Sequence, residues 1–308
     1  MIDFKTVDMS GSAMIALDTV PSTNDVAIEA ARAGAEHGWS VRASLQTAGR
    51  GRRGHSWTSP LGSLYLSIVL RPSVPMQMLM GLPAVTSLGV LDALESLGLS
   101  GRVGVKWPND IVVAPREVSN PNSSQFNRKI AGILVEARSS EAGAFAVAGI
   151  GLNVIALKDA PPAPPEIQAA IDAAESVRRQ QGINTGATGG IPALEPSSLS
   201  EALPEGAELP EQDVIAEKVR SCVLARVERW ERAIKAGLGA AGPLAPILSS
   251  YTESLPMLGK PVNVLSPNGV PMAVGYFADV DPWGRAVVKL GSGEEKTFSA
   301  EVVSLREV

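Results

Sequence analysis

The chain has 308 residues, of which 45% are hydrophobic, and it carries a formal net charge of −5 with an isoelectric point near 5.3. This length corresponds to one large or two modest domains, and the composition allows a sizeable buried core. The acidic balance excludes a general attraction to nucleic acid or anionic membranes, so any basic binding site must be local.

Cysteine and histidine are scarce, with one cysteine, Cys222, and two histidines in the whole chain. An intramolecular disulfide is therefore impossible and no CxxC zinc motif occurs, so we expect Cys222 to be an inert core residue. The N-terminus shows no basic segment followed by an apolar run, and no uninterrupted apolar stretch approaches the ~20 residues that span a membrane. We therefore expect a soluble, cytoplasmic protein without a membrane partner.

The elements predicted in the first half of the chain are mainly strands. A helix is predicted over 20–34, because Ser22 or Thr23 can cap its start and Gly34 can end it, and another over 82–98. Alternating, β-rich segments predict strands at 40–46, 63–72, 102–113 (two strands broken at Pro108), 129–138 and 144–154. Because the later strands follow one another without helices, the sequence predicts an α+β fold whose central sheet is largely antiparallel.

The second half begins with a change of composition. Residues 156–210 are rich in proline, alanine and glycine, which predicts a mobile insertion with one helix near 166–181. An apolar stripe with helical spacing then predicts a long helix over 211–237, and a shorter helix is predicted over 243–253.

After Pro256 the pattern becomes entirely β. Short strands separated by PNG, DPWG and GSGEE turns predict a small C-terminal β-barrel. We therefore expect two domains, 1–256 and 257–308.

The densest basic run is QTAGRGRRGHSWTSP at 46–60, which combines glycines at GxGxxG spacing with Arg50, Arg52 and Arg53. A Rossmann fingerprint requires a helix after the glycines, whereas WTSPLG and an alternating strand follow here. A phosphate P-loop would carry lysine where His55 stands, and the chain lacks the VAIK, HRD and DFG patterns of a kinase. A solvated turn without a ligand stays open as an interpretation. However, arginines packed among glycines repel one another, and a bound carboxylate or phosphate would offset that repulsion.

Five separated segments together resemble the biotin–protein ligases. They are PSTND (21–25), QTAGRGRRGHSWTSP (46–60), KWPND (106–110), RKIAGILVE (128–136) and GIGLNV (149–154), and they span about 135 residues. The glycine/arginine loop together with KWPND is a specific combination, whereas GxGxxG alone is not. The resemblance implies a catalytic domain related to class II aminoacyl-tRNA synthetases, with a mixed, largely antiparallel sheet flanked by helices. The C-terminal strands are similar to the small SH3-like β-barrel of that family.

The resemblance implies a reaction in two steps that uses ATP and Mg²⁺. The biotin carboxylate attacks the α-phosphorus of ATP, which gives biotinyl-5′-adenylate and pyrophosphate. A lysine on a biotin acceptor domain, such as that of an acyl-CoA or pyruvate carboxylase, then attacks the activated carbonyl. Joining two anions requires nearby positive charge, and closure of a glycine-rich loop would shield the reactive anhydride from water.

The family pattern assigns site residues by position. Those implied for biotin binding are Ser22, Thr23, Gln46, Gly49, Arg50, Arg52, Lys129 and Gly132. Those implied for ATP or the adenylate are Arg50, Arg52, Arg53, Trp57, Lys106, Asn109, Lys129 and Asn153. The implied catalytic residues are Lys129, Arg52, Lys106 and Asp110, and no metal ligand is assigned.

Particular roles follow from the same resemblance. Trp57 should stack on adenine, Gly132 should let the ligand lie close to its strand, and Asp110 should orient or deprotonate the incoming lysine. Without the resemblance, the sequence favours Asp110 as a turn cap after Pro108. Lys129 could be a solvated strand end, but the apolar run that follows it leads into the core and places Lys129 at the mouth of a pocket. Other tryptophans, Trp107 and Trp230, are expected to be core residues.

Three features depart from the expected pattern. His55 stands where the loop usually carries arginine, the loop 114–128 is longer than expected, and no helix-turn-helix precedes the catalytic part, so no DNA-binding activity is expected. Two alternatives remain. One is a lipoate or octanoate ligase or transferase of the same superfamily. The other is a nucleic-acid-binding protein, which the acidic charge and the lack of aromatic residues among the arginines disfavour.

Overall fold

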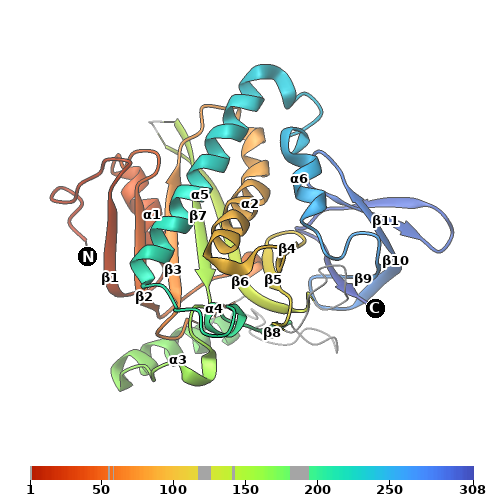
Figure 1. The fold of residues 1–308 in the computed structure, drawn as a ribbon. Helices are drawn as coiled ribbons and strands as arrows, with labels where there is room; N and C mark the ends of the chain where they lie inside the picture. The colour runs from red at the N-terminus through yellow and green to blue at the C-terminus, as the bar shows by residue number, and fades with distance from the viewer. Residues whose placement is uncertain (1, 55, 58, 117–125, 141–142, 181–193) are drawn as a thin grey trace.

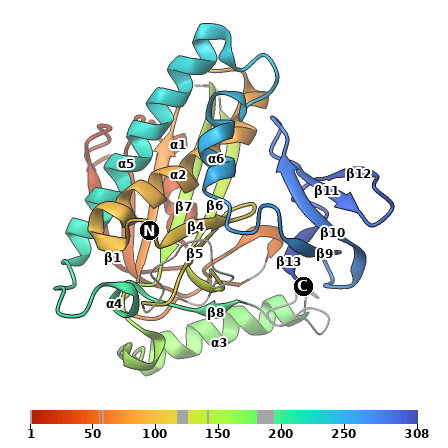
Figure 2. The same ribbon diagram turned by 45° about the vertical axis from the view of Figure 1, so that its right-hand side comes forward.

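The structure is a computed structural model that describes residues 2–54, 56–57, 59–116, 126–140, 143–180 and 194–308. Its strands form two sheets, a large one built before residue 197 and a small one built after residue 260. Helices cover the large sheet, and the small sheet stands to one side of it, beyond helix α6 (Figures 1 and 2).

The large sheet is mixed, with the order β1-β2-β3-β7-β6-β5-β4 and with β8 paired to β6. Strands β1 and β2 are parallel, as are β6 and β8, and every other neighbouring pair is antiparallel. The predicted mixed, largely antiparallel sheet is confirmed. Its strands are β1 (Met14–Val20), β2 (Ser40–Gln46), β3 (Leu64–Leu70), β4 (Val103–Lys106), β5 (Asp110–Val113), β6 (Arg128–Ser140), β7 (Gly143–Leu152) and β8 (Glu195–Pro196).

Helices pack on both faces of this sheet, which explains why the inner strand β3 is buried along its whole length. Alternate residues of β3 belong to two clusters: Ile68 faces the side of α2 and α5, whereas Val69 faces the side of α1. Helices α2 and α5 lie side by side on their face (Figure 1). The helices are α1 (Thr23–Arg32), α2 (Leu82–Leu94), α3 (Pro165–Gln180), α4 (Leu199–Ala202), α5 (Gln212–Ala233) and α6 (Leu248–Glu253).

The segment Met76–Leu99, which contains α2, is long and apolar enough by length and composition to cross a membrane. However, 72% of its most apolar window is buried inside the protein. The segment carries apolar residues on all sides because it lies between the sheet and α5. It is therefore weak evidence for a membrane span, and a buried core helix accounts for the same pattern.

The insertion predicted over 156–210 is partly built into the large sheet. It contains α3, and its later part returns as β8 and α4. The Ser197 amide donates to the Lys129 carbonyl at 2.8 Å, and the Leu199 amide donates to the Asn153 carbonyl at 2.8 Å. Leu199 is fully buried in the main core. Composition predicted only one helix here, because a few apolar anchors in a polar segment give no periodic signal.

The small sheet is antiparallel, with the order β12-β11-β10-β9-β13. Its strands are β9 (Pro261–Leu265), β10 (Pro271–Val280), β11 (Ala286–Leu290), β12 (Glu295–Phe298) and β13 (Ser304–Glu307). Its buried face joins the main core through Trp107, whose ring meets Phe277 edge-on at 6.4 Å and whose Nε1 donates to the Gly284 carbonyl at 3.0 Å. Trp107 and Trp230 are both buried, as predicted. This contact sets the C-terminal sheet directly beside the KWPND turn.

Candidate functional site

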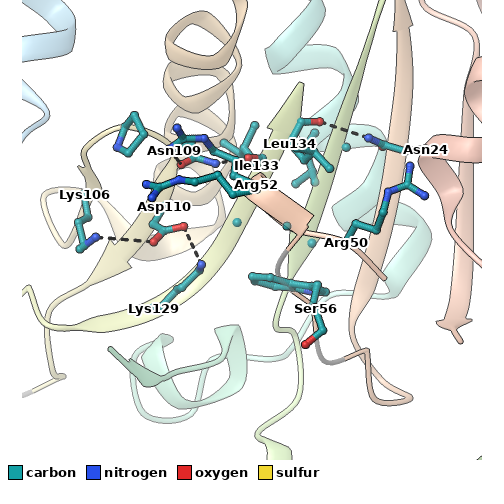
Figure 3. A pocket seen from close by; sticks show the side chains of 18 of the residues that line it. Asn24, Arg50, Arg52, Ser56, Lys106, Asn109, Asp110, Lys129, Ile133 and Leu134 are labelled. Atoms are coloured by element: carbon teal, nitrogen blue, oxygen red, sulfur yellow. Dashed lines mark hydrogen bonds and ion pairs between the residues drawn. The ribbon is translucent and has the colours of Figure 1, made fainter. Parts of the chain in front are cut away.

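A cavity of about 280 Å³ lies where β5, β6 and β7 meet the arginine loop and the C-terminal sheet. Figure 3 shows the side chains of four sequence segments converging there. Most of the predicted site residues line this cavity: Ser22, Thr23, Gln46, Arg50, Arg52, Arg53, Trp57, Lys106, Asn109, Asp110, Lys129 and Gly132. Gly49 and Asn153 do not line it and belong to neighbouring cavities.

Asp110 stands between two lysines (Figure 3). Its Oδ1 lies 2.6 Å from the Lys129 Nζ and its Oδ2 lies 3.8 Å from the Lys106 Nζ. The β-pairing explains the arrangement, because Lys106 and Asp110 are directly opposite in the β4–β5 hairpin and Asp110 is opposite Gly132 of β6. KWPND and RKIAG therefore form one charged cluster.

Burial controls the charge of this cluster. The Lys106 side chain is only 6% exposed, and loss of hydration lowers its pKa to about 7 despite the nearby Asp110. Burial alone would raise the pKa of Asp110, but Lys129 and Lys106 outweigh it and hold that pKa below its usual value. Asp110 therefore remains ionised at neutral pH.

Arg306 is a cationic residue of the cavity that the sequence did not reveal. It comes from β13 and lines the cavity together with Ser304 and with Pro267, from the turn after β9. Burial lowers the pKa of Arg306, and Asp110 partly opposes that effect. Among the described residues that line the cavity, Asp110 is the one carboxylate, and it faces Lys106, Lys129 and Arg306. Such an excess of positive charge suits a polyanionic ligand.

The three arginines of the loop are held by different partners. Arg50 donates two 2.7 Å hydrogen bonds to the Asp25 carboxylate and a third of 3.3 Å to Glu136. Arg52 donates to the Ala300 carbonyl at 2.6 Å. Arg53 donates to two carbonyls of the same C-terminal segment, and its φ of 55° lies in the left-handed region that glycine prefers. Two of the arginines therefore tie the loop to the small sheet.

The opposite end of the cavity is polar but uncharged. The Thr23 amide donates to the Gln46 Oε1 at 2.8 Å, and the Thr23 hydroxyl lies 3.1 Å from the same oxygen. The Gln46 Nε2 donates to the Ser59 hydroxyl at 3.2 Å. Ser22 precedes α1 as its N-cap, is buried, and makes no side-chain capping bond. Leu134 adds an apolar wall. This end can enclose a small ring that carries hydrogen-bonding groups.

Trp57 lies flat on a floor of two glycines. Gly132 and Gly151 are direct partners in the β6–β7 ladder, and a Cβ on either would come within 2.6 Å of the indole. The Lys129 Nζ lies 4.9 Å from the centre of the ring. The space above Gly132, which the sequence assigned to ligand, is therefore filled by Trp57 itself in this structure.

A second cavity, of about 660 Å³, is also lined by Trp57 and Lys129. Asn153 lines it, and its amide donates to the Ser197 carbonyl at 2.9 Å. Asn109, the other predicted adenine contact, remains in the first cavity, where it donates to the Ile133 carbonyl and accepts from Arg52 at 3.3 Å. The indole thus lines both of these cavities, and also the neighbouring one that contains Gly49.

Possible metal ligands and the departures from the expected family pattern remain to be placed in the structure. The described residues contain no group of three or more histidine, cysteine, aspartate or glutamate side chains that could hold a metal ion. His55 and most of the long loop, residues 117–125, lie outside the described residues.

The chain is similar to biotin ligases in sequence, over the cavity-forming segments and over most of its length. The model of the biotin/lipoate A/B protein ligase family matches residues 16–153. The biotin–acetyl-CoA-carboxylase ligase of Paracoccus denitrificans is 28% identical over 283 residues, which cover 91% of this chain and 96% of that protein. The corresponding ligase of Mycobacterium tuberculosis is 28% identical over 305 residues, which cover 96% and 92%.

Two other similar proteins match about half of the chain in sequence and nearly all of it in structure, respectively. The bifunctional ligase/repressor BirA of Escherichia coli is 34% identical over 149 residues, which cover 47% of this chain and 42% of that protein. The biotin protein ligase of Aquifex aeolicus in complex with biotin and ATP is 22% identical, with a TM-score of 0.65, and covers 96% of this chain and all of that one. At this identity the solved structure supports the fold, which extends through the C-terminal sheet.

Proposed function

We propose that this chain, which belongs to the biotin/lipoate A/B protein ligase family, is an ATP-dependent biotin–protein ligase. It forms biotinyl-5′-adenylate from biotin and ATP and transfers biotin to a lysine of an acceptor domain. The observation that carries the proposal is a single cavity in which one carboxylate faces several cations at one end, while neutral hydrogen-bonding groups and an apolar wall form the other end.

The two ends suit the two halves of biotin. The ureido ring would lie against Ser22, Thr23 and Gln46, because a buried ureido group needs hydrogen-bond partners. The valeryl chain would then run past Leu134 toward Lys129, where the carboxylate meets positive charge. The cavity volume of about 280 Å³ lies close to the lower limit for small-ligand sites.

The nucleotide would occupy the cationic end and the second cavity beyond Trp57. Its phosphates would face Lys106, Lys129 and Arg306, and its base would stack on the outer side of Trp57. Attack by a carboxylate oxygen on the α-phosphorus forms a new P–O bond and releases pyrophosphate. The cations lower the cost of bringing the two anions together and stabilise the charge that develops on the phosphoryl oxygens.

In the second step the acceptor amine forms a C–N bond with the activated carbonyl, the C–O bond to AMP breaks, and the proton lost by the amine passes to solvent. The low pKa of Asp110 makes it a weak base. We therefore assign to Asp110 the orientation of the incoming lysine through a hydrogen bond, rather than the removal of its proton.

Mg²⁺ is proposed as the partner of the ATP phosphates. Mg²⁺ sites commonly combine one or two carboxylates with substrate phosphates and water, and Asp110 is the one carboxylate among the described residues that line the cavity. The residues present therefore suit a metal ion that arrives with the nucleotide, and Mg²⁺ would there neutralise phosphate charge. The acceptor is proposed to be the biotin domain of an acyl-CoA or pyruvate carboxylase.

The test is transfer of isotope-labelled biotin to a recombinant biotin acceptor domain. We expect label on the acceptor lysine only with ATP and Mg²⁺, together with one pyrophosphate released for each biotin attached. The same assay with labelled lipoate separates the related alternative, and lipoate transfer without biotin transfer would refute the proposal.

A further inference from the structure

Arg50 is joined to the neutral end of the cavity by a continuous chain of hydrogen bonds. The Glu136 Oε2 accepts from the Arg50 guanidinium at 3.3 Å and from the Asn24 amide at 2.9 Å. The Asn24 Oδ1 lies 2.7 Å from the Ser67 hydroxyl, which lies 2.8 Å from the Thr23 hydroxyl. Figure 3 shows the Asn24 amide directed at the Leu134 carbonyl, to which it also donates at 3.4 Å.

The directions of the protons in this chain are constrained. An amide oxygen only accepts, so the single Ser67 proton must go to Asn24. The Thr23 hydroxyl then has one proton and two acceptors, Ser67 at 2.8 Å and the Gln46 Oε1 at 3.1 Å. The Gln46 oxygen already accepts from the Thr23 amide. A ligand group that contacts the Thr23 hydroxyl therefore changes whether this hydroxyl donates to Ser67 or to Gln46. It thereby changes the strength of the Thr23–Ser67 hydrogen bond.

The chain is also closely packed. Asn24 approaches β7 so tightly that a Cβ on Gly149 would lie 2.1 Å from the Asn24 Oδ1. Asn24 and Ser67 are buried, and the Glu136 side chain is 16% exposed. Hydrogen bonds in such surroundings are stronger than in water, and a change at one member alters its neighbours.

Arg50 is the point at which this chain meets the loop. Its guanidinium is occupied by two carboxylates, Asp25 and Glu136, and the Asp25 hydrogen bonds are the largest cause that raises its pKa. Two anionic partners leave Arg50 little positive charge to offer a ligand. Its side chain instead fixes residues 49–54 to α1 and β6.

We propose that Glu136 and Asn24 are positioning residues that couple occupancy of the biotin end of the cavity to the arginine loop. Glu136 does not line the cavity and acts through Arg50 and Asn24. The inference rests on the proposed function, since it takes biotin as the ligand at Thr23. It assigns a role to Asn24 and Glu136 that is separate from contact with phosphate.

Thermodynamic linkage makes the coupling measurable from both sides. If biotin stabilises the packed state of residues 49–54 by some factor, that state must strengthen biotin binding by the same factor. For couplings of ordinary size the factor is about 5- to 150-fold. A residue that is only structural would instead change the packing of the loop equally with and without biotin.

The test uses the full-length protein and the variant Glu136→Gln, which keeps the size of the side chain and removes its charge. Hydrogen exchange of amides 49–54 is measured with and without biotin, and biotin affinity is measured by calorimetry. We expect biotin to slow exchange of these amides in the wild type. In Glu136→Gln, the ratio of the exchange rate without biotin to that with biotin should fall by about threefold or more, and biotin affinity should fall by the same factor. Ser67→Ala, which breaks the chain at its other end, should change both quantities in the same direction.

Arg138→Ala is the matched control, because Arg138 pairs with the other oxygen of Glu136 at 2.8 Å and touches neither Arg50 nor Asn24 through a hydrogen bond. It should leave both quantities unchanged. If Glu136→Gln and Ser67→Ala bind biotin and slow exchange of amides 49–54 with biotin as much as the wild type does, this inference is wrong and the proposed function still stands. Failure of the wild type to bind biotin would overturn the proposed function, and the inference with it.

Discussion

Gly151→Ala should weaken ATP use while sparing biotin binding. The added Cβ would lie 2.6 Å from both the Cε2 and the Nε1 of Trp57, whereas ordinary contact begins near 3.4 Å. The indole must therefore move by about 0.8 Å or tilt away from the glycine floor. Because the outer side of that ring is the proposed stacking surface for adenine, the displacement acts on the nucleotide.

The size of the effect follows from packing energetics. Adding a methyl group to a well-packed contact costs about 1–3 kcal/mol. If this strain is relieved by moving Trp57, the lost stacking should raise the KM for ATP by about 5- to 140-fold, at about 1.4 kcal/mol for each factor of ten. Gly151 faces the indole and not the Thr23 end, so the biotin Kd should change by less than about twofold.

The assay is steady-state pyrophosphate release as a function of ATP and of biotin, with calorimetry for biotin alone. Gly149→Ala serves as the comparison, because its Cβ would meet Asn24 instead of Trp57, and it should weaken biotin. In the variant that also carries Trp57→Leu, the effect of Gly151→Ala on ATP should largely disappear. A KM for ATP within twofold of the wild type in Gly151→Ala would refute the placement of the base.

The remaining predictions concern the buried cations. Lys106 has a pKa of about 7 in the folded protein against an ordinary value of 10.5, so its burial destabilises the fold fully below pH 7 and progressively less as pH rises toward 10.5. Lys106→Met should therefore raise the melting temperature more at pH 6 than at pH 9, and equal shifts would contradict this assignment. Arg306→Gln removes a cation that faces Asp110, and it should raise the KM for ATP about tenfold or more with biotin affinity retained. An unchanged KM in pyrophosphate-release kinetics would show that Arg306 does not meet the phosphates.

Much of the fold could be predicted because its signals are local. The alternation in 63–72 and the stripe in 211–237 correspond to β3 and α5, and their ends moved by one to four residues. The helix predicted over 82–98 ends as α2 at Leu94 and continues as a π-helical turn to Leu99. Such ends are set by tertiary contacts and capping geometry, which periodicity does not report.

The site was predictable where one segment carries several of its residues. PSTND, the arginine loop and KWPND each brought a run of neighbours into the cavity. Asn24 lies inside the first of these runs, and its place in a quoted motif was the available signal. Glu136 likewise ends the quoted segment RKIAGILVE. Arg306 had no such signal, because it reaches the site through pairing of β13 with β9. Non-local pairing of this kind leaves no mark in the neighbouring residues.

The arginine loop combines two roles that its sequence does not separate. Arg50 faces two carboxylates, so a phosphate would have to displace charged partners from it. Arg52 donates its shortest bond to the neutral Ala300 carbonyl, and its one carboxylate partner, Glu301 at 3.3 Å, is 77% exposed. Arg52 also lines the cavity. A phosphate oxygen carries negative charge and attracts a guanidinium more strongly than a neutral carbonyl does. Exchange of the Ala300 carbonyl for a phosphate oxygen is therefore favourable for Arg52, whereas Arg50 would have to give up two carboxylate partners. The loop can thus present positive charge to the nucleotide through one arginine while another keeps it attached to α1 and β6.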